Sequence, residues 1–329
     1  EIMPSLVGSE MCIRDRLEGI EDYVGENVRV LYSEGCHLYR DRTSNLAMEH
    51  DRDSEVRAVC EASDVVIAVV GLDATLEGEE GDTGNEYGSG DKPNLNLPGL
   101  QPDIIRIAKE SGKPVIVVLL AGSAMALSWE DEHVDAILDG FYPGAQGGAA
   151  IAEILFGGAN PEGKLPITFY QTTEELPEFT DYAMKGRTYR YMENEALYPF
   201  GYGLSYTTYA YGNLECVKPF DAQDGITLQV TVTNTGDREG TETLQVYVKA
   251  KREGTPNPQL KYVKKITLKP GESVTEEIHL SPEAFMLYDE KGNFTLEKGA
   301  YDIFVGGCQP DARSAALTGN APQKLTVTY

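Results

Sequence analysis

The sequence has little that would suit a membrane or a nucleic acid. No apolar run approaches the roughly 20 residues that a membrane-spanning helix needs. Acidic residues outnumber basic ones by 53 to 28, which gives a formal net charge of −25. No basic patch offsets this charge, so nucleic acid and anionic membrane surfaces are poor partners. A neutral ligand suits such a chain better than an anionic one.

Cysteine and histidine are too few and too scattered to suggest a metal site or a disulfide framework. The five cysteines lie far apart, and no two form a C-x-x-C pair, which rules out zinc-finger spacing. The four histidines form no H-E-x-x-H arrangement. We therefore expect no metal and no cofactor. Isolated thiols favour a cytoplasmic location slightly over a secreted or periplasmic one.

The first 16 residues, EIMPSLVGSEMCIRDR, lack the basic, apolar and small-residue regions of a signal peptide. They resemble translated sequencing-adaptor read-through. We interpret residues 1–16 as non-native and expect the native chain to enter near Leu17, already inside a domain. The absence of a signal peptide therefore leaves the location open.

From Val28 onward, short apolar runs alternate with helix-like segments. The runs are VRVLYSEG, DVVIAVVGLD, KPVIVVLLAGS and VDAILDGFYPG, and such continuous apolar runs are typical of strands buried on both faces. The segments between them carry apolar residues at i, i+3 and i+4. This alternation predicts an α/β domain over residues 17–169, with a mostly parallel sheet flanked by helices.

After Tyr206 the apolar residues alternate with period two instead. ITLQVTVTN and ETLQVYVKA flank the turn TGDREG, and further turn signals recur along the tail. This pattern predicts an antiparallel β-sandwich over residues 209–329. A Tyr- and Pro-rich connector without clear periodicity, residues 170–208, joins it to the α/β domain.

The segment TLEGEEGDTGNEYGSGD, residues 75–91, places six carboxylates on a glycine-rich loop directly after an apolar run. Ligands of open α/β sheets bind outside the carboxyl ends of the strands. A carboxyl group held among other carboxylates has a raised pKa, which suits a general acid. A solvated acidic loop is the alternative that composition alone favours. Calcium binding is the weakest reading, because the D-x-[DN]-x-[DN]-G pattern is absent.

Four long motifs occur in order along the chain. They are GLDATLEGEEGD…NLNLPGLQ, GKPVIVVLLAGSAMALSW, AILDGFYPGAQGGAAIAEILFGGANPEGKLPITF and GRTYRYMENEALYPFGYGLSYTTY. Together they resemble the carboxyl-terminal half of glycoside hydrolase family 3, most closely its β-xylosidase and β-glucosidase branch. The resemblance runs from Leu17 to the end, where it implies a fibronectin type III-like domain. It implies a fragment of a retaining β-glycosidase that removes terminal non-reducing β-D-xylose or β-D-glucose from xylo- or gluco-oligosaccharides.

The resemblance also implies which residue does chemistry. In the family, an aspartate nucleophile lies in an amino-terminal TIM barrel and a glutamate acid/base lies on a loop of the α/β domain. The E-G-x-D pattern assigns the acid/base to Glu79, three residues before Asp82, with Glu80 and Glu77 as fallbacks. Glu80 stands where the family often has glycine, and Thr83 replaces the usual arginine.

The nucleophile is not expected in this chain. No TIM barrel precedes Leu17, and we expect the first strand of the α/β domain to be missing as well. We therefore predict that the polypeptide alone is inactive and that its partner is the barrel of the same protein. Family members also commonly form homodimers.

The rival hypothesis is a non-catalytic carbohydrate-binding or adhesion module. The presence of Glu79 favours the enzyme. The resemblance assigns no substrate-binding residues here, because most contacts that separate xylose, glucose and arabinose come from the barrel.

Overall fold

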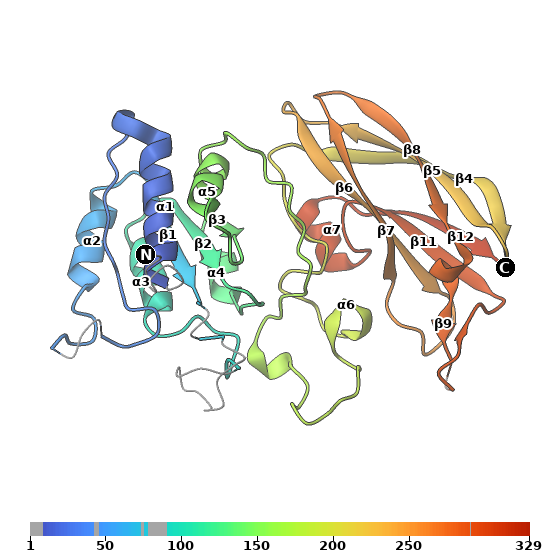
Figure 1. The fold of residues 1–329 in the computed structure, drawn as a ribbon, viewed down its shortest axis with the longest axis horizontal. Helices are drawn as coiled ribbons and strands as arrows, with labels where there is room; N and C mark the ends of the chain where they lie inside the picture. The colour runs from blue at the N-terminus through green and yellow to red at the C-terminus, as the bar shows by residue number, and fades with distance from the viewer. Residues whose placement is uncertain (1–8, 43–45, 74–75, 78–90, 290) are drawn as a thin grey trace, which may run out of the picture. The chain divides into compact units, whose positions relative to one another are not determined.

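The computed structural model describes residues 9–42, 46–73, 76–77, 91–289 and 291–329. The chain divides into two compact units (Figure 1). One consists of residues 1–159 and 170–175, and the other of residues 160–169 and 176–329.

The first unit alternates helices and strands, as predicted. In chain order its elements are α1 (Ser9–Val24), the 3-10 turn η2 (Gly25–Asn27), α2 (Asp53–Glu61), β1 (Val66–Gly71), α3 (Gln101–Glu110), β2 (Val115–Leu120), α4 (Ser128–His133), β3 (Ala136–Asp139), α5 (Gly147–Leu155) and the 3-10 turn η3 (Thr173–Glu175).

The sheet of this unit is parallel, with the strand order β1-β2-β3. Val66–Gly71 pair residue for residue with Val115–Leu120, and 116–119 pair with 136–139. β1 and β2 contain only apolar residues and glycine, which suits strands covered on both faces. The predicted parallel sheet is confirmed.

Helices cover both faces of the sheet. On one face, Val56 of α2 and Ile107 of α3 pack with Val115 of β2. On the other face, Ile151 of α5 packs with Val118. Successive strand residues point to opposite faces, so Val115 and Val118 of β2 contact helices on opposite faces of the sheet. This arrangement is the α/β sandwich that the sequence predicts.

One predicted strand is absent. The run VRVLYSEG, residues 28–35, forms no strand, although Val28 has extended backbone angles. A strand exists only through hydrogen bonds to a neighbour. Among the described residues, this segment has no strand beside it, and a cleft separates it from β1.

The second unit is almost entirely β-structure. Its elements are α6 (Thr188–Tyr191), β4 (Tyr209–Asp221), β5 (Gly225–Asn234), β6 (Gly240–Ala250), β7 (Gln259–Leu268), β8 (Ser273–Leu280), the 3-10 turn η4 (Pro282–Phe285), β9 (Leu287–Tyr288), β10 (Phe294–Thr295), β11 (Ala300–Gly306), α7 (Ala312–Thr318) and β12 (Gln323–Thr328).

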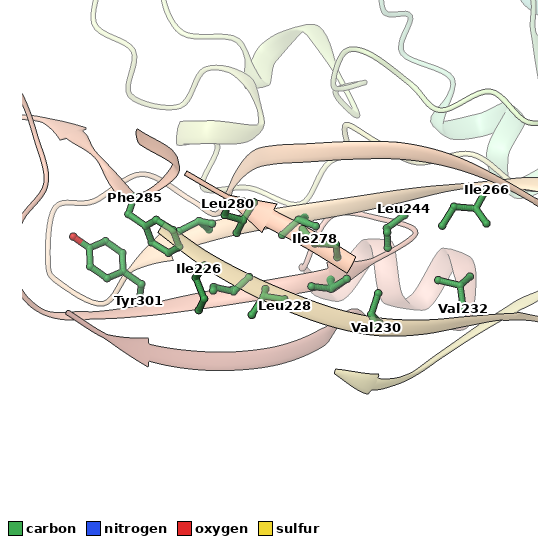
Figure 2. Packing of buried hydrophobic residues seen from close by; sticks show 14 of the residues in the cluster. Ile226, Leu228, Val230, Val232, Leu244, Ile266, Ile278, Leu280, Phe285 and Tyr301 are labelled. Carbon is green, nitrogen blue, oxygen red and sulfur yellow. The ribbon is translucent and has the colours of Figure 1, made fainter. Parts of the chain in front are cut away.

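Two antiparallel sheets form the predicted sandwich, with the orders β12-β11-β6-β7 and β4-β5-β8. Ile226, Leu228, Val230 and Val232 of β5 are fully buried, while the residues between them are partly exposed. Figure 2 shows this row in the core with Leu244 and other apolar side chains. The period-two pattern in the sequence therefore marks the core face of the strand.

The connector packs against the sandwich through aromatic rings. Tyr189 of α6 stacks on Phe200 at 4.2 Å between ring centroids and meets Tyr247 of β6 edge-on. The side-chain amide of Asn257 donates to the carbonyls of Tyr189 and Met192. Residues 176–208 therefore belong to the second compact unit, whereas 170–175 belong to the first.

We predict that Leu228→Ala lowers the free energy of unfolding of the second unit by about 3 kcal/mol, because it opens a cavity in a fully buried site. Urea unfolding followed by circular dichroism measures the change. Val217→Ala on β4 is the control, because Val217 is 51% exposed. Equal losses in both variants would contradict the assigned core.

Candidate active site

The three parallel strands end at one edge of the sheet, and polar side chains gather in the loops that follow. Asp73 and Glu77 follow β1, Ser123 follows β2, and Tyr142 follows β3, whose last residue is Asp139. This edge is where open α/β sheets bind ligands. Glu79 and Glu80, with Asp82 and Thr83, lie outside the described residues.

A tight turn brings Glu77 back over the end of β1. The backbone amides of Leu76 and Glu77 donate to the carbonyl of Asp73 at 3.0 and 3.2 Å. Leu76 is almost fully buried, and Asp73 is buried as well. The buried side chain of Leu76 therefore holds the turn against the core. The hydrogen bond from the Glu77 amide to Asp73 fixes the backbone from which the Glu77 side chain extends.

The carboxylate of Glu77 joins all three loops. Its Oε2 accepts the backbone N–H of Gly122 at 3.1 Å and the hydroxyl of Tyr142, and its Oε1 accepts the hydroxyl of Ser123. The side chain of Glu77 is 13% exposed. Hydrogen bonds to an ionised carboxylate are stronger than neutral ones, so this contact holds the loops together.

Gly122 is required by the closeness of these groups. A Cβ at this position would lie 2.6 Å from the Tyr142 ring and 3.3 Å from Glu77 Oε2. Any larger residue would push the ring or the carboxylate out of place. The glycine that ends the apolar run KPVIVVLLAG therefore has a role at the site.

Lys92 ties the far end of the acidic segment to the same loop. Its Nζ donates to the carbonyl of Ala124 at 2.6 Å and lies 3.9 Å from Glu77 Oε1. Burial lowers the pKa of Lys92 to about 8, and the charge of Glu77 opposes part of this shift. Glu77 and Lys92 thus both contact the loop after β2.

Asp139 and Tyr142 complete the described groups at this edge. Burial raises the pKa of Asp139 to about 6, although Oδ1 accepts the N–H of Phe141 at 3.0 Å. Its Oδ2 is buried and has no hydrogen-bond partner in the part of the chain that the structure describes. Burial, followed by the hydrogen bond to Glu77, raises the pKa of Tyr142.

Sequence reasoning named one of these groups as catalytic, the fallback Glu77, and missed Ser123, Asp139 and Tyr142. The missed residues lie at or just after strand ends, so the strand-end rule could have found them. The described residues contain no cluster of three or more potential metal ligands. No helix in the described part of the chain has the length and apolar character to cross a membrane.

Comparison with known proteins decides the family. The sequence model of the glycosyl hydrolase family 3 C-terminal domain matches residues 6–206, and that of a fibronectin type III-like domain matches residues 242–309. The chain belongs to glycoside hydrolase family 3. The resemblance and fold class predicted from the sequence are thereby confirmed.

Similar proteins include a β-xylosidase and a β-glucosidase. The chain is 41% identical to a xylan 1,4-beta-xylosidase of Xylanibacter ruminicola over 258 residues, which are 77% of this chain and 30% of the relative. It is 36% identical to a periplasmic beta-glucosidase of Salmonella typhimurium over 318 residues, which are 88% of this chain and 40% of the relative.

Solved β-glucosidase structures share the fold. A β-glucosidase from Erythrobacter marinus superposes with a TM-score of 0.78 at 30% identity, over 95% of this chain and 43% of that one. A β-glucosidase from Listeria innocua in complex with isofagomine superposes with a TM-score of 0.75 at 27% identity, over 96% of this chain and 42% of that one. The chain thus spans less than half the length of these relatives.

We predict that Lys92 makes stability rise with pH. Its pKa falls from 10.5 to about 8 on folding, so between these values the unfolded chain binds more protons than the folded chain. The free energy of unfolding contributed by this group therefore increases as the pH rises through that window. Lys92→Met should remove this increase.

Urea unfolding of the wild type and Lys92→Met at several pH values between about 8 and 10.5 measures the difference. Lys113→Met, just before β2, is the control for loss of one lysine from the same unit. Parallel pH profiles for the wild type and Lys92→Met would contradict the shifted pKa.

Proposed function

We propose that this chain carries the acid/base loop of a retaining β-glycosidase. The substrate would be a xylo- or gluco-oligosaccharide, from which the enzyme removes the terminal non-reducing β-D-xylose or β-D-glucose. The names of the relatives support this substrate class. The observation that carries the proposal is that Glu77 and Lys92, the described residues on either side of Glu79, are both held at the carboxyl edge of the sheet.

In this proposal Glu79 is the acid/base. It would first protonate the leaving oxygen of the glycosidic bond and later deprotonate the attacking water. A retaining mechanism needs a second carboxylate about 5 Å away as the nucleophile. That aspartate would come from the TIM barrel of a longer protein, which is the partner that this loop serves.

Glu77 has a different role in the proposal. Its carboxylate oxygens accept hydrogen bonds from Gly122, Ser123 and Tyr142, so neither is presented to an incoming sugar. It is therefore a positioning residue, two residues before Glu79. A fixed Glu77 limits where Glu79 can lie, and catalysis by proton transfer depends on that placement.

We expect the isolated chain to release no aryl alcohol from aryl β-xyloside or aryl β-glucoside. In a chimera, residues 17–329 replace the matching part of the Xylanibacter ruminicola xylosidase and so regain a complete protein. There, Glu79→Gln should lower kcat/KM about 10²- to 10⁴-fold for xylobiose and much less for an aryl xyloside, whose leaving group needs little protonation. For the aryl xyloside kcat should fall instead, because the attacking water loses its base in the second step. Azide should restore turnover of the aryl substrate, because it attacks without a base.

Glu80→Gln in the same chimera is the matched control and should keep most of the activity. Turnover by the isolated chain that Glu79→Gln abolishes would contradict the need for a barrel. Tight binding of xylobiose by the isolated chain in calorimetry, with an inactive chimera, would favour the carbohydrate-binding module instead.

We predict that Glu77→Gln in the chimera lowers kcat by about the same factor for good and poor leaving groups, on the order of 10-fold, because it misplaces the loop without removing the acid. Tyr142→Phe should act in the same direction and more weakly. Neither variant should respond to azide. A strong dependence on the leaving group together with azide rescue would instead make Glu77 the acid/base.

A further inference from the structure

The turn after β3 has a backbone conformation that its sequence does not favour. Phe141 has a φ of 49°, in the left-handed region that residues other than glycine rarely adopt. Gly140, which could adopt this conformation without a steric penalty, lies one residue earlier and has no positive φ. Contacts elsewhere in the protein must therefore hold Phe141 in place.

Asp139, the last residue of β3, makes such a contact. Its Oδ1 accepts the backbone N–H of Phe141 at 3.0 Å, two residues further along the chain. Aspartate side chains often stabilise tight turns in this way. Between them, the N–H of Gly140 donates to the carbonyl of Leu119 on β2 at 2.9 Å. The strand therefore fixes the start of the turn, and the Asp139 side chain fixes the residue after it.

This turn directs Tyr142 at Glu77. Tyr142 follows Phe141 in the chain, and its hydroxyl donates to Glu77 Oε2. Tyr142 is 45% exposed, so packing alone does not fix its ring. The direction of the ring depends on the backbone at Phe141, which Asp139 holds. Asp139 is thus linked to Glu77 through two hydrogen bonds and one turn.

A carboxylate is a destabilising choice for this task. Oδ2 of Asp139 is buried and has no hydrogen-bond partner among the residues that the structure describes. A buried charge loses its hydration, and an unpaired oxygen recovers none of that loss. The carbonyl oxygen of an asparagine could accept the same N–H without a charge. A residue that breaks a local rule in this way is expected where the charge itself has a role.

No neighbouring charge accounts for the environment of Asp139. β2, which pairs with β3, has no ionisable residue, and the charged residues of α4 precede the opposite end of β3. The charges on the other surrounding elements are the exposed Glu153 of α5, the buried Arg16 of α1, and Asp73 and Glu77 after β1. Burial raises the pKa of Asp139 to about 6, against the opposing hydrogen bond from Phe141.

The strength of the contact depends on the charge of Asp139. A hydrogen bond to an ionised carboxylate is roughly twice as strong as one to a neutral acceptor. The ionised side chain therefore holds the N–H of Phe141 more tightly than the protonated one. With the pKa of Asp139 at about 6, this change falls in a range where many proteins are folded.

We propose that Asp139 is a positioning residue of the acid/base site, whose ionised carboxylate holds the left-handed turn at Phe141 and so aims Tyr142 at Glu77. Protonation of Asp139 loosens the turn, and the arrangement of the site responds to pH. The catalytic consequence rests on the proposed function. The turn itself can be measured in the isolated chain, without any activity.

Labelling with 15N-phenylalanine tests the turn, because the chain has only nine phenylalanines. The amide signal of Phe141 is assigned by its loss in Phe141→Leu. We expect this signal to shift between pH values of about 5 and about 7.5, with a midpoint near 6. Asp139→Asn should remove the titration. Asp135→Asn, just before the opposite end of β3, is the matched control and should keep it.

Stability gives a second readout, with a sign that a purely structural residue would not show. The pKa of Asp139 rises on folding from 3.8 to about 6, so in this window the folded chain binds more protons than the unfolded chain. The stability contributed by Asp139 therefore falls as the pH rises through the window. Asp139→Asn should raise the urea midpoint at a pH of about 7.5, and the gain should shrink toward a pH of about 5.

The chimera tests whether Asp139 acts through Tyr142. At a pH of about 7.5, Asp139→Asn should lower kcat/KM about 3-fold, by the same factor for xylobiose and the aryl xyloside. It should have little further effect when Tyr142→Phe is already present, because both changes remove the same contact. Additive losses would show that Asp139 does not act through Tyr142.

Failure of this inference can be told apart from failure of the proposed function. A Phe141 signal that does not titrate, or that still titrates in Asp139→Asn, overturns the role of Asp139 even if the chimera is active. An Asp139→Asn chain that is unfolded or less stable than wild type at a pH of about 7.5 overturns it as well. An inactive chimera made with the wild-type sequence contradicts the proposed function, and the two measurements on the isolated chain still decide the turn.

Discussion

The carboxylate of Glu77 is the contact on which the arrangement of the candidate site depends. It receives one backbone and two side-chain hydrogen bonds, and the donors come from the loops after β2 and β3. Hydrogen bonds to a charged acceptor are worth more than neutral ones, and leaving their donors unsatisfied when buried is costly. The three loops therefore hold one another in place through a single anionic group.

The positive charge of Lys92 favours the ionised Glu77 carboxylate in a protein that is otherwise strongly acidic. The chain carries a net charge of −25, so a further carboxylate brought close to the acidic segment meets repulsion. Lys92 offsets part of it from 3.9 Å away. Its burial makes the ammonium less favourable, which is why its pKa falls to about 8. The site thus combines the Glu77 carboxylate, which accepts several hydrogen bonds, with the Lys92 ammonium, which burial partly destabilises.

The sequence predicts those features that depend on local pattern. The runs VIAVVG and VIVVLL predict β1 and β2, and the alternation ITLQVTVTN predicts the buried row of β5, because strand periodicity is written into consecutive residues. The strand predicted over 28–35 is absent because strand formation needs a hydrogen-bonded neighbour, whatever the distance between the two segments in the sequence. Local periodicity carries no information on that neighbour.

The site could be predicted only in part, for a related reason. The acidic segment and Glu77 stand out in composition, since glycine and carboxylates follow an apolar run. Ser123 and Tyr142 lie 46 and 65 residues after Glu77 in the sequence. They contact Glu77 only because the three strands before these loops end at one edge of the sheet. Their role follows from the parallel topology and not from a motif.

The end of β1 leads directly into the turn that positions Glu77. Gly71 ends β1 so close to β2 that a Cβ there would lie 2.0 Å from the carbonyl oxygen of Leu120, and the Asp73 turn begins two residues later. Gln101 holds Gly71 from the opposite side. Anything that secures the open edge of β1 therefore also secures the base of the turn that carries Glu77.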